Sequence, residues 1–449
     1  MINKRKIIFF LILILVSNCS FDNKTGIWGD SEKEKKNIAD LERKQKQIIE
    51  VEKIYSSENV FSKEISLTKN ITLSKARKNA EWTTSNLNNQ NFLGNIYLTD
   101  IQNKSLKKKI GKNKFSMHKD ISTILAHTNN LIFSDDKGTI YNINKYGKIN
   151  WKKNIYKKSY KKIYKHLTFS ISKNNIYIAD NIGLVYSINL STGKLLWIKN
   201  YGLPLKSNIK IFNNKIFLID QDNKIISLDT KDGSLIWDIL SISSFIKTQN
   251  LLSVAISKEG YLFASTSSAD LLKIDSNTGN IIWSRNTAGS LYANATDFFT
   301  SSDIVISESQ IFFSSGTSFF SYNIDDGAIK WQNEISFSGP AIIDKQYVFI
   351  VSNNGYFVIL NKDTGEIISS FNILKILKRK RQNTQVTSFI MGSGKIYSTT
   401  SNGFLIVSST QTGKAEYFKK IGEKNVSPLI INDGTLYILT ENSKIIGLR

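Results

Sequence analysis

The sequence predicts an all-β fold, an eight-bladed β-propeller with four antiparallel strands in each blade. The first observation behind this prediction is a repeated pattern, shown by residues 274–283 (IDSNTGNIIW), in which a polar turn ends in Gly and a Trp follows four residues later. The turn glycines of strong and weak copies are 38 to 48 residues apart, which is the repeat length of propeller blades. These glycines are Gly147, Gly193, Gly233, Gly279, Gly327, Gly365 and Gly413.

The second observation is a pair of strand patterns in each unit. In the second unit, residues 175–180 and 184–189 are β-type runs joined by a short turn that contains Gly183. A further short apolar run, such as residues 340–343, lies before each pair, so a unit holds four strands, as a propeller blade does. Eight pairs occur, at residues 130–143, 175–189, 215–229, 261–275, 310–324, 346–361, 395–409 and 435–448.

The Trp of the repeated pattern is expected to seal one blade against the next. The Gly suits a turn with positive φ, and the Trp lies in the strand that follows the turn. There its flat apolar ring can pack against a neighbouring sheet, so we expect these side chains to be largely buried between blades. The expected seals are Trp151, Trp197, Trp237, Trp283 and Trp331.

The eighth unit ends at Arg449 without an outer strand. Because an unpaired edge is an aggregation liability, an N-terminal strand is expected to close the ring. Residues 104–110 are the first candidate, with Leu106 in the place of the Trp, and residues 81–83, which contain Trp82, are the alternative.

The chain before the repeats has three expected parts. Residues 1–18 combine a short basic start with an apolar run and are typical of a signal peptide. Cys19 ends this run in a pattern that resembles a bacterial lipobox, so we expect it to be lipidated. Residues 19–78 are highly charged and predict a lipid-anchored tether, partly disordered or helical, in which Trp28 is exposed. The propeller is expected to span residues 79–449.

Composition restricts the chemistry. The net charge of +23 comes mostly from scattered Lys without an aromatic platform, so we expect no nucleic-acid partner. Cys19 is the only cysteine, which excludes an intrachain disulfide or a multi-cysteine metal site. His118, His127 and His166 show no metal-ligand spacing. We therefore expect neither a cofactor nor a metal, and no catalysis.

The repeat of the form Asp-x-x-Thr-Gly-x-x-x-Trp, as at residues 275–283, resembles the quinoprotein-type propellers. Together with the lipobox and Asn79-Ala-Glu-Trp82, it is similar to the BamB family of outer-membrane protein assembly lipoproteins. The resemblance implies a non-catalytic scaffold of the barrel assembly (BAM) machinery that docks onto periplasmic POTRA domains of BamA. It also implies a monomer within a hetero-oligomeric complex, lipid-anchored at the periplasmic face of the outer membrane of a Gram-negative bacterium.

The same resemblance implies that docking uses loops around the fourth and fifth blades. A family Asp-x-Asp pattern is matched by Asp297, Phe298 and Phe299, with only the first acid kept. A family Leu-x-Leu-Arg stretch is matched by residues 245–247, with Lys247 in the place of the Arg. These four side chains are the expected partner-binding residues.

Two alternative functions compete with the scaffold. The first is a quinone (PQQ)-dependent dehydrogenase, a class whose family pattern includes adjacent cysteines and a calcium site, which a chain with Cys19 alone does not match. The second is binding of periplasmic polysaccharide or lipid through the basic loop of residues 375–381.

Overall fold

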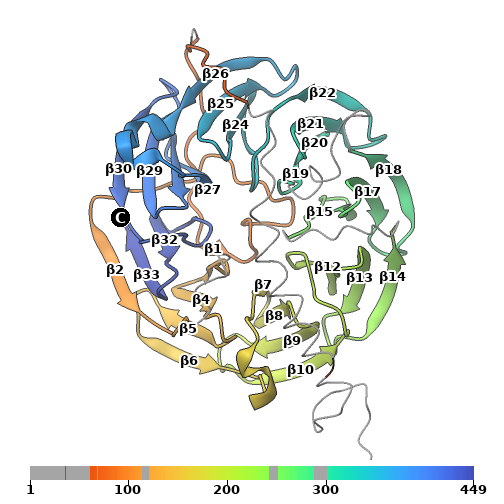
Figure 1. Ribbon diagram of the computed structural model, residues 1–449. Helices are drawn as coiled ribbons and strands as arrows, with labels where there is room; N and C mark the ends of the chain where they lie inside the picture. Colours follow the sequence, from red (N-terminus) through yellow and green to blue (C-terminus); the bar gives the residue numbers. More distant parts are fainter. Residues whose placement is uncertain (1–35, 37–60, 68, 114–120, 242–250, 288–300) are drawn as a thin grey trace, which may run out of the picture.

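The computed structural model describes residues 36, 61–67, 69–113, 121–241, 251–287 and 301–449. Eight antiparallel sheets stand around one central axis and form a closed ring (Figure 1). The predicted eight-bladed propeller with four antiparallel strands per blade is thus confirmed. Among these residues no helix is of a length and hydropathy that would span a bilayer.

The first four blades follow the chain, and each is given from its innermost strand outward. Blade one comprises β1 (Glu81–Trp82), β3 (Leu125–His127), β4 (Asn130–Ser134), β5 (Ile140–Asn144) and β6 (Ile149–Lys153). Blade two comprises β7 (Leu167–Ser172), β8 (Asn175–Asp180), β9 (Leu184–Asn189) and β10 (Leu195–Asn200). Blade three comprises β11 (Lys210–Phe212), β12 (Lys215–Ile219), β13 (Lys224–Asp229) and β14 (Leu235–Leu240). Blade four comprises β15 (Val254–Ile256), β16 (Tyr261–Ser265), β17 (Asp270–Asp275) and β18 (Ile281–Asn286).

The other four blades complete the ring. Blade five comprises β19 (Val305–Ser307), β20 (Gln310–Ser315), β21 (Ser318–Asn323) and β22 (Ile329–Asn333). Blade six comprises β23 (Ile342–Asp344), β24 (Tyr347–Val351), β25 (Tyr356–Asn361) and β26 (Ile367–Asn372). Blade seven comprises β27 (Val386–Gly392), β28 (Lys395–Thr400), β29 (Phe404–Ser409) and β30 (Ala415–Lys420). Blade eight comprises β31 (Ile430–Asn432), β32 (Thr435–Leu439), β33 (Lys444–Leu448) and β2 (Lys104–Lys109). Two 3-10 helices, η1 (Lys158–Lys162) and η3 (Ile373–Arg381), lie in connections between blades.

Each outer strand carries a β-bulge at the same place. In blade four, Trp283 pairs with Lys273 and Ile281 pairs with Ile274, so Ile282 has no partner in the register. The same shift, one residue before the Trp position, occurs in the outer strands of all eight blades. A bulge bends the strand and leaves the extra residue unpaired. This residue is exposed in every blade except blade six, where Ile368 is half-buried.

The turn glycines serve both the backbone and the packing. Gly279 has a φ of 80°, and a Cβ added to it would lie 3.0 Å from Trp237 Cδ2 of the preceding blade. Gly193, Gly233, Gly327 and Gly365 meet the Trp of the preceding blade in the same way. The Trp of one blade thus lies on the turn of the next.

The Trp side chains are less uniformly buried than the sequence predicts. Trp283 and Trp331 are 8% and 7% exposed, whereas Trp151, Trp197 and Trp237 are half-buried. The indole N–H groups of Trp151, Trp197, Trp237 and Trp331 donate to carbonyl oxygens in the next blade, those of Leu190, Thr230, Ser276 and Lys362.

Residues 104–109 close the ring as the sequence predicts. Strand β2 pairs with β33 and carries the same bulge as the other outer strands, although the chain is not continuous between the two. Leu106 takes the place of the Trp, and a Cβ on Gly147 of blade one would lie 2.9 Å from its Cδ1. The alternative closure by Trp82 is wrong, because β1 pairs with β3 on the inner side of blade one.

Residues 74–99, the axial segment, run through the middle of the ring (Figure 1). The segment bonds to the inner strands or inner turns of every blade, beginning with β1 on β3 in blade one. Further examples are Ile171 N to Thr83 O in blade two, Asn89 Nδ2 to Ile211 O in blade three, Ile256 N to Asn89 O in blade four, and Ile306 N to Gln90 O in blade five. Blades six, seven and eight bond through Ser74 N to Asp344, Ile96 N to Met391 O, and Thr99 N to Gly434 O.

The last part of the expected tether packs on the ring. Ile65 exchanges two backbone hydrogen bonds of 2.9 Å with Ser370, and Ile71 is buried. Glu64 lies 2.7 Å from Lys375, which lowers the pKa of this carboxyl. The packed body therefore includes residues before 79, because an extended segment adds to the edge of blade six. Cys19 and Trp28 lie outside the described residues.

Candidate docking surface

The rim of blades two to five exposes large apolar side chains at repeat-equivalent positions. Leu235 is 52% exposed, Leu240 is 64% exposed, and Ile329 is 55% exposed. Several of these residues stand at the bulge or just before it, which explains why a strand-type apolar run faces outward. We call this set the apolar arc: Leu196, Leu235, Ile236, Leu240, Ile281, Ile282 and Ile329. Strands β14, β18 and β22, which carry most of it, follow one another along one side of the ring (Figure 1).

Two charged groups beside the arc, Asp238 and Arg285, are engaged within the protein. Asp238 of β14 lies 3.2 Å from Lys224. Arg285 of β18 donates to the carbonyl oxygens of Gly327 and Asp326 in the next blade, at 3.1 and 2.6 Å. The arc therefore offers exposed apolar area, beside which Lys330 of β22 is an exposed basic residue. Exposed apolar area of this kind is typical of an interaction surface.

The expected partner-binding residues Lys247, Asp297, Phe298 and Phe299 lie outside the described residues. The structure does describe where their two connections begin and end. The first follows β14 and the second follows β18, so both leave from strands of the apolar arc. The anchor of the second is Thr287, whose hydroxyl donates to Ala269 O at 2.6 Å, and the chain resumes where Ser301 pairs with Ser315.

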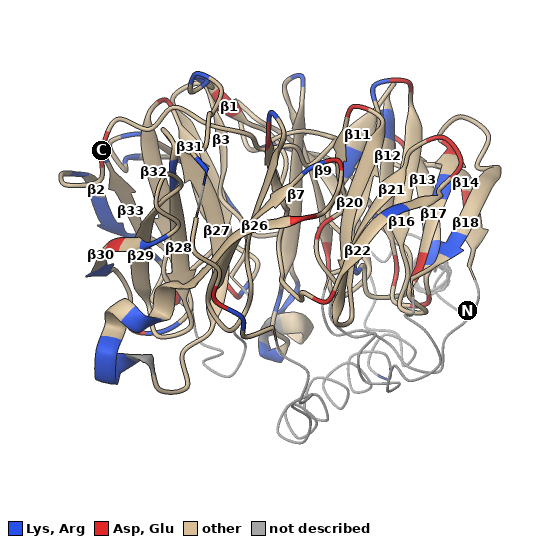
Figure 2. Cartoon of the chain, turned by 90° about the horizontal axis from the view of Figure 1, so that it is seen from above, with Lys and Arg blue, Asp and Glu red and all other residues tan. Residues whose placement is uncertain are grey.

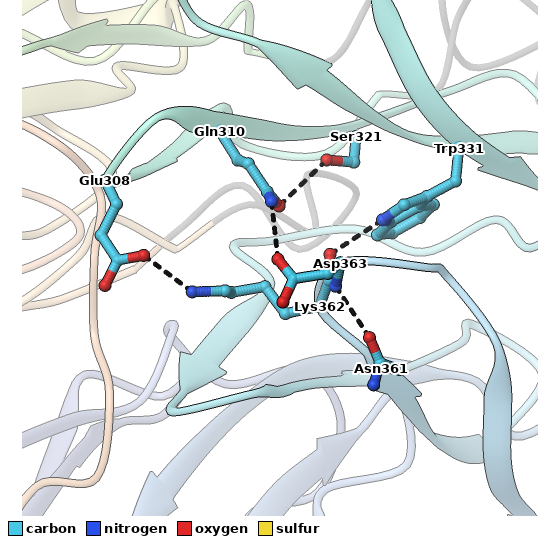
Figure 3. Close-up of polar contacts among 7 residues, drawn as sticks. All are labelled: Glu308, Gln310, Ser321, Trp331, Asn361, Lys362 and Asp363. Carbon is cyan, nitrogen blue, oxygen red and sulfur yellow. Dashed lines mark hydrogen bonds and ion pairs between the residues drawn. The ribbon is translucent and has the colours of Figure 1, made fainter.

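A polar network holds blade five against blade six (Figure 3). Gln310 Nε2 donates to Asp363 Oδ1 at 2.9 Å, and its Oε1 accepts from Ser321. Lys362 precedes Asp363 in the turn of blade six, and its carbonyl oxygen accepts from Trp331 Nε1 at 2.8 Å. The ammonium group of Lys362 lies 2.8 Å from Glu308. The network fixes the turn of blade six on blade five, and with it the rim beside β22.

A buried lysine pins the axial segment to blade three. Lys210 Nζ donates to Asn91 Oδ1 at 2.6 Å, to Asn88 O at 2.7 Å and to Thr84 Oγ1 at 3.3 Å. Burial lowers the pKa of Lys210 to about 7, and the nearby Asp303 opposes that shift. Burial also raises the pKa of Asp303. Sequence reasoning missed this residue, although Lys210 is the only charged residue that begins one of the strands β3, β7, β11, β15, β19, β23, β27 and β31.

The remaining candidates show local roles. His127 lies 3.1 Å from Glu81, His166 precedes β7, and His118 is outside the described residues. Within the described ranges, no three His, Cys, Asp or Glu residues gather as metal ligands. The basic loop of residues 375–381 forms most of η3, where Lys375 meets Glu64 and Lys380 Nζ lies 5.8 Å from the ring centre of Phe404.

Comparison with known proteins agrees with this architecture. A curated relative, the outer membrane protein assembly factor BamB of Moranella endobia, is 20% identical over 299 residues, 64% of this chain; the chain spans 64% of that relative's length. The crystal structure of BamB from Moraxella catarrhalis has a TM-score of 0.64 at 13% identity, covering 78% of this chain and 99% of that one. A europium-containing methanol dehydrogenase shares the fold with a TM-score of 0.61 at 10% identity, over 80% of this chain and 89% of that one.

A match to a family model distinguishes between the similarity to BamB and the similarity to the dehydrogenase. The model described as outer membrane protein assembly factor BamB matches residues 136–371, from the middle of blade one to the outer strand of blade six. This match covers more than half of the 449 residues. The chain therefore belongs to the BamB family of outer membrane protein assembly factors.

Proposed function

We propose that this chain is a non-catalytic scaffold in the assembly of outer membrane proteins, and that it docks onto POTRA domains of a BamA-like protein. Membership of the BamB family supports the assembly role. The likeness to a methanol dehydrogenase is one of fold alone, at 10% identity. In this proposal Cys19 carries the lipid that holds the chain at the periplasmic face of the outer membrane, and Cys19→Ser loses outer-membrane fractionation.

The observation that carries the docking proposal is the apolar arc. It stands on strands β14, β18 and β22, and the two connections that hold Lys247 and Asp297 start from β14 and β18. A partner that covers the arc removes exposed Leu and Ile side chains from water, a favourable contribution to binding. The two connections then supply polar and aromatic contacts beside this apolar centre.

The experiment is capture of purified POTRA domains by the full chain and by arc variants. Leu240→Arg with Ile281→Arg places two charges in the proposed interface, and we expect a loss of about 2 kcal/mol or more of binding free energy. Both side chains are largely exposed, at 64% and 46%, so the melting temperature is expected to stay unchanged. Asp297→Arg tests the adjoining connection and is expected to abolish capture as well.

Tyr146→Arg is the matched control. Tyr146 is 75% exposed on the rim of blade one, away from the arc, and its variant is expected to capture POTRA domains like the wild type. Undiminished capture by the Leu240→Arg, Ile281→Arg variant would contradict the proposed docking surface.

A further inference from the structure

The closing strand β2 and its neighbour in blade one form a dense group of lysines. Lys104, Lys107, Lys108 and Lys109 of β2 are all exposed, and only Leu106 points into the ring. A Cβ on Gly147 would lie 2.9 Å from Lys108 Cδ, so the turn with Lys145 and Lys148 lies directly against β2. Basic side chains of two blades therefore share one surface.

The surface continues into blade seven. Lys420 ends β30, the outer strand of that blade, and η3 adds the exposed Lys378, Arg379 and Lys380. Figure 2 shows basic segments on β2 and on the coil below β30 along the same side of the ring. We call this set the basic flank: Lys104, Lys107, Lys108, Lys109, Lys145, Lys148, Lys152, Lys378, Arg379, Lys380 and Lys420.

Within the described part of the chain, no acidic side chain pairs with the basic flank, although Lys380 and Lys420 lie over the ring of Phe404 and Lys420 donates to Asn402 O. Neither β2 nor β6 contains an acidic residue. Glu416, the acid of β30, is engaged by Lys395 at 2.6 Å. No residue of the flank takes part in an ion pair with another described residue at 4.0 Å or less.

Protection of an edge strand does not explain this distribution. Lysines on an edge prevent unwanted pairing with other chains, and every blade has such an edge. Yet the outer strands of blades three, four and five, β14, β18 and β22, contain only Arg285 and Lys330 as basic residues. The lysines are concentrated where blades seven, eight and one meet, so their presence there requires a function other than protection of an edge.

We propose that the basic flank binds the anionic headgroups of a membrane, with the ring standing edge-on to the lipid surface. The flank is built on outer strands and turns rather than around a cavity, and it spans three blades, a shape that fits an extended anionic surface. Flexible, strongly hydrated lysines suit dispersed phosphate groups. Tyr146, 75% exposed between Lys145 and Lys148, adds an amphipathic ring of the kind found at membrane interfaces.

The geometry separates this surface from the proposed docking surface. Strands β2 and β30 lie on one side of the ring, and β14 and β18 lie on the other (Figure 1). With the flank on the membrane, the apolar arc faces away from the lipid and is open to a periplasmic partner. The inference relies on the proposed function only for the location beside a membrane.

The test is cosedimentation with vesicles, using the chain that starts at residue 20 so that neither an acyl chain nor the apolar leader contributes. We expect binding to phosphatidylcholine vesicles that contain about a quarter phosphatidylglycerol, and none to pure phosphatidylcholine. The variant Lys104→Gln, Lys107→Gln, Lys109→Gln, Lys148→Gln is expected to bind about tenfold more weakly or worse. Raising the salt to about 0.5 M should release the wild type, because exposed charges are screened.

The matched control removes four positive charges from other blades. Lys194, Lys231, Lys258 and Lys330 are exposed on blades two to five, and their replacement by Gln is expected to leave vesicle binding close to wild type. Equal losses in both variants would show an effect of net charge alone and would overturn the proposal, as would no binding by the wild type. Loss of vesicle binding with intact capture of POTRA domains supports the flank independently of the docking surface.

Discussion

The apolar arc and the basic flank lie mainly on outer strands of one ring, the arc on blades two to five and the flank on blades seven, eight and one and on η3. Both are built from outer strands with the same bulge and the same turn. At the bulge itself, blades two to five carry Leu196, Ile236, Ile282 and Lys330, whereas blades seven, eight and one carry Glu416, Ser105 and Asn150. The residue just before the bulge is Leu235 or Ile281 in the arc. In the blades of the flank it is Lys104 in blade eight and Ile149, 42% exposed, in blade one.

The repeated pattern determines the backbone of each blade, whereas the residues on the rim differ from blade to blade. Inner and middle strands supply most of the buried apolar side chains that form the hydrophobic clusters of the ring. The bulge position contributes little to that core, so selection can place a hydrophobic or a charged group there without a change of fold. Two surfaces of different chemistry can therefore arise on a symmetric scaffold.

The seals of individual blades differ in burial, and this difference predicts the largest effect. Trp331, below the arc, is 7% exposed and donates to Lys362 O at 2.8 Å, so Trp331→Ala should cost about 3–5 kcal/mol of stability. Tyr417 takes the Trp place in blade seven and is half-buried, so Tyr417→Ala should cost clearly less. Urea unfolding midpoints measure both. Equal costs would mean that the seals do not distinguish the two sides.

The buried Lys210 predicts a smaller, pH-dependent effect on the side of the arc. Its pKa in the folded protein is lowered to about 7, whereas an unfolded lysine has a pKa of about 10.4. Between these values the unfolded chain binds more protons, so this residue makes stability rise with pH by up to about 1.4 kcal/mol per unit. Below about pH 7 both states are protonated and the contribution is constant.

Lys210→Met isolates this effect when unfolding is measured between pH 7 and 9. The variant should lose the rise in stability that the wild type shows between pH 7 and 8. Above that range Lys165, whose pKa burial lowers to about 8, contributes a similar slope in both proteins. Parallel stability curves for the two proteins across pH 7 to 8 would show that Lys210 does not titrate in that range.

The smallest effect is expected for exchange of the bulge residues themselves. Ile236→Lys with Ile282→Lys gives blades three and four a basic rim like that of blade eight. Both side chains are already more than 40% exposed, so the melting temperature should stay near wild type, within about 0.5 kcal/mol of stability for each change. Marked destabilisation would mean that the arc is part of the structural core.

The ring was predictable from the sequence because every blade contains the same local pattern of strands, turn glycine and Trp. The spacing of Gly279 and Trp283 recurs, and even the closing strand was identified by Leu106 in the Trp place. The axial segment was not predictable, since residues 74–99 have no repeat and their partners are distant in sequence. The sequence alone does not show which way the apolar residues before each Trp face, and the bulge leaves them exposed.

The candidate site was predicted less well than the fold. Family resemblance pointed to Lys247 and Asp297, which lie outside the described residues, and so that assignment stays a prediction. The arc, which surrounds the starts of their connections, was not identified because exposure of Leu240 or Ile281 depends on what the neighbouring blades leave uncovered. Lys210 was missed because its three acceptors come from a segment more than a hundred residues earlier.

The central claim is that the two sides of the ring serve different partners, and hydrogen exchange with added POTRA domains tests it most directly. We expect slower exchange of backbone amide hydrogens in β14, in β18 and in the connections that follow them, with the exchange rates of β2 and β30 unchanged. Protection of β2 and β30 instead, or no protection of β14 and β18 under conditions where the complex forms, would contradict the division of the rim into a docking side and a membrane side.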